Sequence, residues 1–229
     1  MSFAIIFVHK TNSSYLKYAL KQARYFNPLS EIVLLGDNTN NVYDFASHHL
    51  ISDYSEGAAK FNNVYQHHSY TPLEFELFCF QRWFIIRDFL KTKNYSSFVF
   101  LDTDVLVYTD LEKAVSAFPP CRIANTGVAM PAFTYIQDRE TLNDFCNFML
   151  QHYTLPHLID RIEKGWEYLE PKKWGGICDM VLFEYYKADH PTYFFQADTI
   201  LNNSTFEMGL RSSEGFEMQG IYKKLKWKG

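Results

Sequence analysis

The sequence lacks the features that define several common protein classes. Its four cysteines (Cys79, Cys121, Cys146 and Cys178) are widely separated, so there is no close pair for a zinc site or a redox dithiol. We expect them to be reduced and half-buried. The 22 lysines and arginines are outnumbered by 26 aspartates and glutamates, and the net charge of -4 provides no whole-protein field for nucleic acid phosphates. We therefore expect no nucleic acid partner.

Long apolar runs are also missing. The start, MSFAIIFVHK, has no basic region before its apolar residues, which are too few for a signal-peptide core or a membrane span. We interpret it as the first strand of a cytoplasmic protein without a transmembrane segment. We find no internal repeat, low-complexity tract or linker, and 229 residues with 47% apolar types bury one sizeable core. One globular unit is expected.

Aromatic residues are abundant, at 18% of the chain, chiefly 21 Phe and 16 Tyr. Most of them must belong to the core, because their large apolar surfaces favour burial. The excess also leaves aromatic side chains for stacking on a flat ligand.

The amino-terminal part follows a strand, helix, strand pattern. Phe3 to Val8 is β-branched and aromatic, cap-type residues 11 to 14 precede helically spaced apolar positions from Leu16 to Ala23, and Glu31 to Leu35 forms a second strand. Such a unit favours a parallel sheet.

The remaining elements are less regular. Residues 38 to 71 are polar and predict mostly surface loop, with one short strand near His49 to Ser52. The neighbouring pairs His48–His49 and His67–His68 are interpreted as surface residues. A long helix after Pro72 leads into a central strand at Phe98 to Leu101. Further helices are predicted at Leu111 to Ala117, Arg139 to His152 and Cys178 to Lys187, and short strands near Ile123 to Met130 and Thr192 to Phe195.

Two carboxylates follow the central strand, in FVFLDTDVLVY. Asp102 and Asp104 come directly after four apolar residues, at the end of a strand where open α/β sheets bind ligands. On an extended backbone residues i and i+2 face the same side, so the two carboxylates are expected to converge. Such a pair suits a hard divalent ion, Mn²⁺ or Mg²⁺, with positions left open for diphosphate oxygens. The alternative is that both aspartates accept backbone N–H bonds in a turn.

The order of segments around this pair resembles the GT-A nucleotide-sugar glycosyltransferases, and most closely their family 8 branch. A helix bearing an arginine leads into a strand ending in D-x-D in QRWFIIRDFLKTKNYSSFVFLDTDVLVYTDL; an N-x-G segment follows in ANTGVAM, and an acidic residue opens a helix in GGICDMVLFEYY. The likeness covers roughly residues 3 to 190. It implies a Rossmann-like GT-A fold with a mixed, mainly parallel central sheet flanked by helices, in a single compact domain over residues 1–229. The nucleotide-binding half would be about 1–108, and the sugar and acceptor half about 109–229.

The resemblance also implies roles for individual residues. Asp104 would bind the metal, Asp102 the metal or the ribose, and Arg82 the diphosphate or the acidic pair. Asp179 would bind a donor hydroxyl or assist the acceptor. The base and ribose would lie against the end of the first strand, Asp37 and the D-x-D loop, and the donor sugar against the N-x-G segment; these residues are Val8, His9, Lys10, Thr11, Asp37, Thr103, Asn125 and Gly127.

Each of these roles has a plainer alternative. Arg82 could form an ion pair on a helix surface, and Asp179 could cap the helix that it opens. Asp37 and the segment from Asn125 to Gly127 could be ordinary turns.

The carboxyl-terminal part departs from the resemblance. GT-A enzymes of this kind usually supply a third metal ligand there, often a histidine, but the last histidine here is His190 and the tail EGFEMQGIYKKLKWKG has none. Three explanations stay open: the chain lacks a C-terminal segment, another residue or water replaces the ligand, or metal binding is weak. The lysines of KKLKWK are expected on a solvated strand face, with contact to an anionic lipid surface or a phosphorylated acceptor as the alternative.

The sequence thus predicts a metal-dependent hexosyl- or related glycosyltransferase of polysaccharide biosynthesis. Its donor would be a nucleotide-diphosphate sugar, with UDP the favoured base and GDP the alternative. Its acceptor would be a hydroxyl of a glycan or glycolipid, and the family likeness favours retention of configuration. Two alternatives remain: a haloacid-dehalogenase-type phosphohydrolase, whose motif would need Thr or Val where Leu106 stands, and a sugar-nucleotide-binding module without catalysis.

Overall fold

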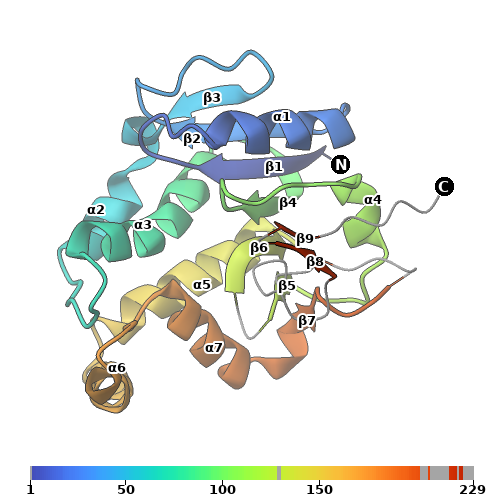
Figure 1. Ribbon diagram of the computed structural model, residues 1–229. Coiled ribbons are helices and arrows are strands. Elements are labelled where there is room, and N and C mark those ends of the chain that lie inside the picture. Colours follow the sequence, from blue (N-terminus) through green and yellow to red (C-terminus); the bar gives the residue numbers. More distant parts are fainter. Residues whose placement is uncertain (1, 128–129, 202–205, 207–216, 221, 224–229) are drawn as a thin grey trace.

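A seven-stranded sheet forms the centre of the molecule, with strand order β3-β2-β1-β4-β6-β5-β7 (Figure 1). The computed structural model describes residues 2–127, 130–201, 206, 217–220 and 222–223. Within this sheet β6 runs antiparallel to β4 and β5, and the other neighbouring pairs are parallel. The strands are β1 (Ser2–Val8), β2 (Glu31–Gly36), β3 (Ser47–Leu50), β4 (Tyr95–Leu101), β5 (Ile123–Thr126), β6 (Met130–Ile136) and β7 (Phe194–Gln196), with a separate pair β8 (Met218–Gln219) and β9 (Tyr222–Lys223).

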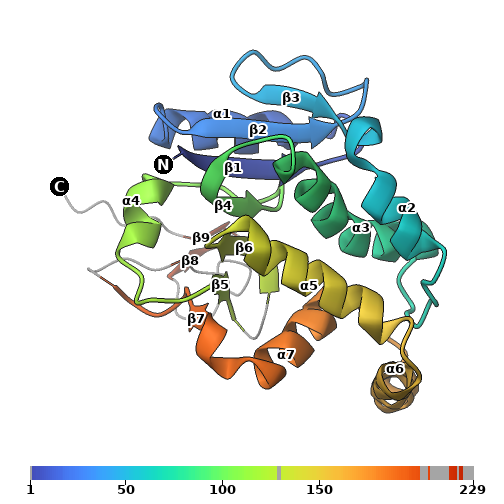
Figure 2. The same cartoon turned by 180° about the vertical axis from the view of Figure 1, so that it is seen from behind.

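Helices cover both faces of this sheet (Figures 1 and 2). One face carries α1 (Leu16–Phe26) and α4 (Leu111–Ser116). The other carries α2 (Glu56–Asn62), α3 (Leu73–Leu90), α5 (Arg139–His152), α6 (Pro156–Leu169) and α7 (Asp179–Asp189). Three short 3₁₀ turns complete the connections: η1 (Ile51–Tyr54), η2 (Glu170–Lys172) and η3 (Pro191–Tyr193). The expected compact α/β domain with a mixed, mainly parallel sheet is confirmed.

The strands are apolar on both sides because both faces of the sheet are covered. In β4, Phe98 and Phe100 pack with the α3 side, whereas Val99 and Leu101 pack with the α1 side. This alternation follows from the two-residue period of a strand. A residue two positions after Phe100, just past the end of β4, is therefore expected on the face of the sheet that packs against α3.

Helix α3 is apolar around its whole circumference, which is typical of a buried helix. Its buried charged residues Glu76, Arg82 and Asp88 all have partners. Asp88, for example, accepts a hydrogen bond from the backbone N–H of Gly57 at 2.7 Å and so attaches α2 to α3. Charged groups persist inside this helix because each is paired, since an unpaired buried charge is strongly disfavoured.

Several predicted elements were wrong or misplaced. The region 38 to 71 contains the predicted loops and, as β3, the predicted short strand, but η1 and α2 within it were not predicted, and neither was helix α6. The strand predicted from Ile123 to Met130 is two antiparallel strands separated by a turn, in which Gly127 has φ 57°. Short elements of this kind are stabilised by tertiary contacts, such as burial of Phe61 of α2, rather than by a local pattern.

Two expectations about single residues also change. All four cysteines are free, as expected, but Cys146 and Cys178 are buried rather than half-buried. His49 is part of β3 and its ring packs on Phe89 at 4.9 Å, so it is not a simple surface residue. Within the described ranges, no helix combines the length and apolar character needed to cross a membrane.

Replacement of Phe145 tests the packing of the helical layer. Its ring stacks on Phe183 of α7 at 3.9 Å and is fully buried. We expect Phe145→Ala to lower the free energy of unfolding in urea by about 3–5 kcal/mol, because it removes a buried ring and leaves a cavity. Leu29→Ala, at a residue that is 100% exposed, is the control and should change it by less than about 0.5 kcal/mol. Equal effects of the two changes would contradict this account of the core.

Candidate functional site

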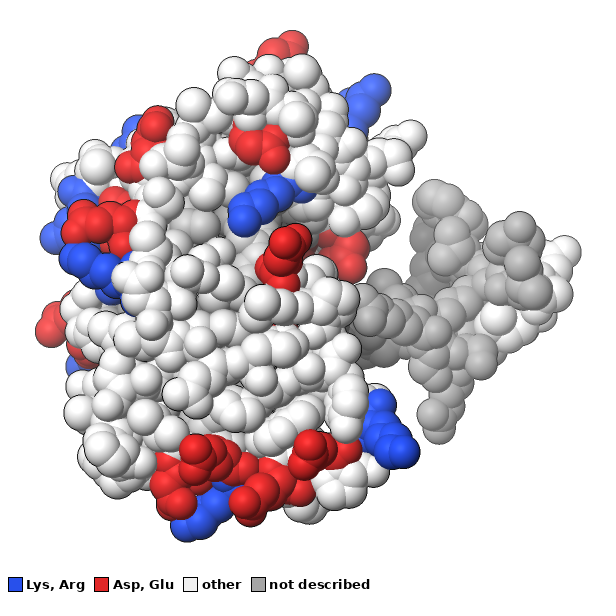
Figure 3. All heavy atoms as spheres, turned by 90° about the vertical axis from the view of Figure 1, so that its left-hand side faces the viewer, with Lys and Arg blue, Asp and Glu red and all other residues white. Residues whose placement is uncertain are grey.

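A large cleft, with a volume of about 2060 Å³, opens at the carboxyl ends of β1 and β4. Figure 3 views the molecule from the side on which β1 ends, where acidic and basic side chains lie close together in the middle of a largely uncharged face. Nine of the predicted site residues line this cleft: Val8, His9, Lys10, Thr11, Arg82, Asp102, Thr103, Asp104 and Asp179. They come from four segments of the chain.

The guanidinium of Arg82 holds the centre of the site together. Its Nη1 donates to Oδ1 of Asp102 at 2.6 Å, and its Nη2 and Nε donate to Oδ2 of Asp179 at 2.6 and 3.2 Å. The indole of Trp83 donates to the same Asp179 oxygen at 2.9 Å. Arg82 is buried, so it does not form the surface ion pair that was the alternative interpretation. It reaches the acidic pair through Asp102.

Asp179 begins α7, but its side chain does not cap that helix. The N-cap residue is Cys178, which makes no side-chain capping bond. The Asp179 side chain is only 3% exposed and accepts its hydrogen bonds from α3. The residue therefore connects the start of α7 to α3.

The charges around Arg82 shift one another. Burial lowers the pKa of Arg82, but the carboxylates of Asp179 and Asp102 raise it more, so the guanidinium stays charged. Burial raises the pKa of Asp102 above its ordinary value; Arg82 opposes this shift, and the charges of Asp179 and Asp104 reinforce it. The site therefore concentrates negative charge around a single buried cation.

Asp102 continues the Phe100 side of β4 and meets α3, but Asp104 is placed by a turn rather than by strand alternation. Strand β4 ends at Leu101, and the N–H of Val105 donates to the carbonyl of Asp102 at 3.1 Å, which closes a turn over residues 102 to 105. The expectation of two carboxylates on one extended backbone was therefore wrong in its geometry. Asp104 still lies close enough for its charge to raise the pKa of Asp102, after the larger effects of burial and Asp179. Asp102 is partly buried against Arg82, and Asp104 is exposed.

The end of β1 packs against this turn. The His9 ring lies between Thr103 and Ser13, with Nδ1 to Thr103 Oγ1 and Nε2 to Ser13 Oγ both at 3.0 Å. Burial lowers the pKa of His9, whereas the charge of Asp37 raises it. The ammonium of Lys10 lies 4.3 Å from the centre of the Phe78 ring, on the α3 wall of the cleft. His9 and Lys10 therefore present polar groups beside the acidic turn.

Asp37 does not line the cleft but forms hydrogen bonds with the backbone that follows β1. It accepts the N–H of Thr11, whose φ of 69° is left-handed, at 2.6 Å, and that of Thr39 at 2.8 Å. Burial raises the pKa of Asp37, but these hydrogen bonds lower it below the ordinary value. The interpretation of Asp37 as a turn residue fits this geometry.

Asn40, which the sequence did not single out, works with Asp37. Its fully buried side chain donates to the carbonyls of His9 and Thr11, both at 2.9 Å, and accepts from the N–H of Asp37 at 3.0 Å. It thereby ties the end of β1 to the end of β2.

Of the N-x-G segment Asn125–Gly127, Thr126 lines the cleft, but Asn125 and Gly127, the two residues predicted to hold the sugar, do not. Asn125 is fully buried, and both polar atoms of its side chain lack a hydrogen-bond partner. Its predicted contact with the donor sugar stays a prediction.

The sequence interpretation also missed Glu76. This carboxylate lies in the first turns of α3, lines the cleft and accepts a hydrogen bond from Ser69 Oγ at 2.9 Å. Burial raises its pKa, Ser69 lowers it and the charge of Asp179 raises it, with a net upward shift. The available signal was a glutamate inside a helix that is apolar all round.

The described residues do not by themselves form a complete metal centre. Over the residues that the structure covers, no group of three or more His, Cys, Asp or Glu side chains is arranged to hold an ion. Asp102 and Asp104 both line the cleft, and their role as metal ligands stays a prediction. Most of the carboxyl-terminal tail, including nearly all of KKLKWK, lies outside the described residues.

The geometry defines the class of fold: an α/β sheet with an acidic turn at the end of its central strand. The sequence matches no protein-family model and no curated protein. Among solved structures the chain is similar to the apo form of mouse xyloside xylosyltransferase 1, with a TM-score of 0.56 and 10% identity over 86% of each chain. At this identity the likeness establishes a shared fold, the GT-A fold.

Two further structures show weaker likeness. The glycosyltransferase GlyE of Streptococcus pneumoniae is 17% identical over 86% of this chain and 46% of its own, with a TM-score of 0.48. The PaToxG glycosyltransferase is 13% identical over 83% and 70%, with a TM-score of 0.47. TM-scores below 0.5 do not establish a shared fold.

The buried ion pair between Arg82 and Asp179 predicts a large loss of stability from a single substitution. Asp179→Asn should lower the free energy of unfolding in urea by about 3–5 kcal/mol, because it removes one charged partner of a buried ion pair. The matched control is Asp189→Asn at the other end of α7, where Asp189 pairs with Arg161 at 2.7 Å in a partly exposed position. There the loss should stay below about 1 kcal/mol. A loss from Asp179→Asn no larger than the control would show that the pair does not organise the site.

The pKa of His9 provides a second test, by NMR titration of its ring protons. We expect a midpoint below the ordinary 6.5, because burial disfavours the imidazolium. Asp37→Asn should lower the midpoint further, since it removes a charge that raises the pKa. Between the folded midpoint and 6.5 the unfolded chain binds more protons, so His9 should make stability fall as the pH drops through this window. A midpoint at or above 6.5 would contradict the buried, neutral ring.

Proposed function

We propose that this protein is a metal-dependent glycosyltransferase, which moves a sugar from a nucleotide-diphosphate donor to a hydroxyl of a glycan or glycolipid acceptor. The observation that carries the proposal is the acidic turn Asp102–Asp104, held by Arg82 at the base of the cleft at the carboxyl end of β4. Ligands of open α/β sheets bind at this edge. The GT-A fold shared with a xylosyltransferase supports the same assignment.

The charge of the cleft supports a requirement for a cation. Among the described residues that line it are seven carboxylates and three lysines or arginines. A diphosphate carries negative charge and would be repelled by this surplus. A divalent ion between the diphosphate and the acidic turn removes the repulsion.

The residues present fit such an ion in part. Asp104 is exposed at the cleft and Asp102 is partly buried beside it, so both would contribute oxygen ligands, with the remaining positions left to the diphosphate and water. When bound, Mn²⁺ or Mg²⁺ would neutralise charge that grows on the leaving diphosphate.

The protein's own side chains would bind and orient the donor. His9, Lys10, Thr11 and Thr103 form the wall against which base and ribose would lie, with UDP as the favoured nucleotide. Arg82 fixes Asp102, so the acidic turn is preorganised before the donor arrives. Asp179 keeps the guanidinium in place and lines the part of the cleft proposed for the sugar.

A thermal-shift panel tests the proposal. The ligands are UDP, GDP, CDP and dTDP and their sugars, each with Mn²⁺ or with a chelator. A ligand that binds only the folded state, present at a hundred times its Kd, raises the free energy of unfolding by about 2.7 kcal/mol. For a chain of this size the Tm then rises by roughly 5–10 °C. We expect such a shift for one base, with metal only, and its loss in Asp104→Ala.

Asp44→Ala, at an exposed aspartate outside the cleft, is the matched control and should behave as wild type. No shift with any nucleotide would reject the proposal. Phosphate release from p-nitrophenyl phosphate would then test the phosphohydrolase alternative. A metal-dependent shift without turnover of any donor sugar would identify a binding module instead of an enzyme.

A further inference from the structure

We propose that Trp174, with Phe75 on the same cleft, forms an aromatic platform that binds a neutral sugar ring of the acceptor glycan. The inference rests on the proposed function and assigns the acceptor side of the same cleft. Both residues line the cleft together with Asp179. Trp174 is 71% exposed and Phe75 is 64% exposed, so both rings are accessible from the cleft.

The backbone on both sides of Trp174 is held in a left-handed conformation. Lys173 has φ 55° and Gly175 has φ 74°. A left-handed lysine costs roughly 1–2 kcal/mol, so the rest of the structure must hold it there. Residues in such conformations gather at ligand-binding sites. The turn therefore presents Trp174 to solvent at some cost in stability.

Backbone hydrogen bonds to residues 68 and 70 fix this turn. The N–H of Tyr70 donates to the carbonyl of Gly175 at 2.9 Å, and the N–H of Ile177 donates to the carbonyl of His68 at 2.8 Å. At Gly176 an added Cβ would lie only 2.3 Å from Cα of Ser69, so only glycine fits there. Ser69 is held in turn by Glu76 of α3. The platform is thus rigidly attached beside the start of α3.

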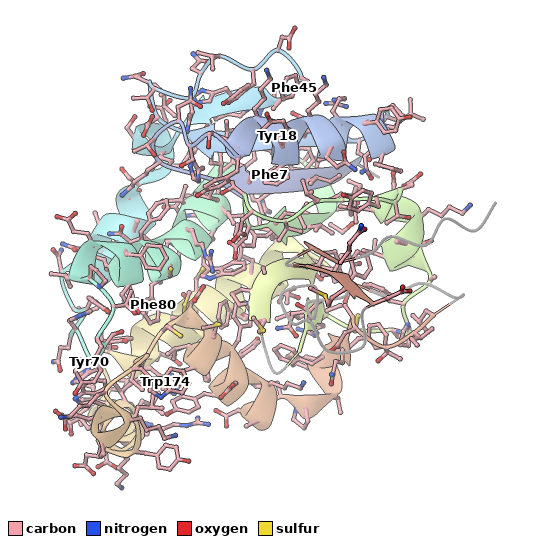
Figure 4. The ribbon with its side chains drawn as sticks, viewed as in Figure 1. Phe7, Tyr18, Phe45, Tyr70, Phe80 and Trp174 are labelled. Atoms are coloured by element: carbon pink, nitrogen blue, oxygen red, sulfur yellow. The ribbon has the colours of Figure 1, made fainter. Side chains whose placement is uncertain are left out.

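The Trp174 ring differs from its aromatic neighbours. Tyr70 packs on Trp166 at 5.4 Å, and the ring of Tyr168 carries the ammonium of Lys172 at 3.8 Å. Over the described part of the chain, neither another ring nor a cation packs on the indole of Trp174. Figure 4 shows Trp174 and Tyr70 at the same end of the molecule, below Phe80 of α3. The indole face is therefore open to a ligand.

The surroundings of the ring select the ligand chemistry. A sugar ring has an apolar face of C–H groups, which an aromatic plane covers, and an edge of hydroxyls, which need polar partners. Thr71 and Glu74 line the same cleft and offer a hydroxyl and an exposed carboxylate, and the charge of the buried Glu76, bonded to Ser69, lies beside them. These carboxylates disfavour an acidic sugar or an anionic lipid. A neutral sugar residue fits both the ring and the charge.

Carbohydrate titration tests the platform directly. Cellotetraose and maltotetraose, two neutral glycans of different shape, are titrated into wild type, Trp174→Ala and Trp174→Phe by calorimetry. We expect one of them to bind, Trp174→Ala to weaken its binding about tenfold or more, and Trp174→Phe to retain most of it. The control is Tyr168→Ala, which removes a ring with the same 71% exposure that does not line the cleft, and should bind as wild type.

The nucleotide shift is measured on the same variants and separates the two proposals. A tenfold loss of glycan binding in Trp174→Ala with an unchanged nucleotide shift supports the platform. Unchanged glycan binding in Trp174→Ala, or no binding of either tetrasaccharide by wild type, overturns it and leaves the donor site standing. A dimer that dissociates in Trp174→Ala, seen by light scattering, also overturns it, because the indole would then be covered by a second copy. Absence of any nucleotide shift rejects the proposed function and not the platform.

Discussion

The buried guanidinium of Arg82 is the constraint on which the site depends. Removing such a group from water is costly, and the cost is offset only by close, geometrically matched carboxylates. These carboxylates come from the turn after β4 and from the first residue of α7, while Arg82 itself belongs to α3. Three segments separated by up to 97 positions are thereby fixed in one arrangement. The acidic turn, the wall of α3 and the start of α7 cannot shift independently.

The cleft that results has two different sides. Near β1 it is polar and built from short hydrogen bonds among His9, Ser13 and Thr103, which suits a base and a ribose. Near α3 and the loop after α6 it presents exposed aromatic rings beside carboxylates, which suits a neutral sugar. Between them lies the acidic turn, where a diphosphate needs a cation. In the proposed function these zones would hold the base, the diphosphate and the acceptor.

The sequence predicted those elements that neighbouring residues stabilise better than those that depend on contacts with distant residues. Helix α5 was predicted with its observed bounds, and β1, β2, α3 and β4 were found because their apolar patterns are long and local. Helix α2 was missed because its position follows from partners elsewhere, such as Asp88, whereas α6 has an amphipathic pattern that the sequence interpretation overlooked. The acidic pair was found, but its geometry was not, since the turn at Asp102 departs from strand alternation. Asn40 and Trp174 left no local signal of their roles, and the signal of Glu76, a glutamate within an apolar helix, was not recognised.

The sequence by itself determined the class of fold and the place of the acidic pair at the end of the central strand, because strand patterns and chain order are properties of neighbouring residues. Tertiary structure alone decided that Asp179 meets Arg82, that Asn125 turns away from the cleft wall and that Trp174 stands open beside α3. These arrangements depend on contacts between residues far apart in the chain. Burial and charge are properties of the folded neighbourhood, and no segment carries them alone.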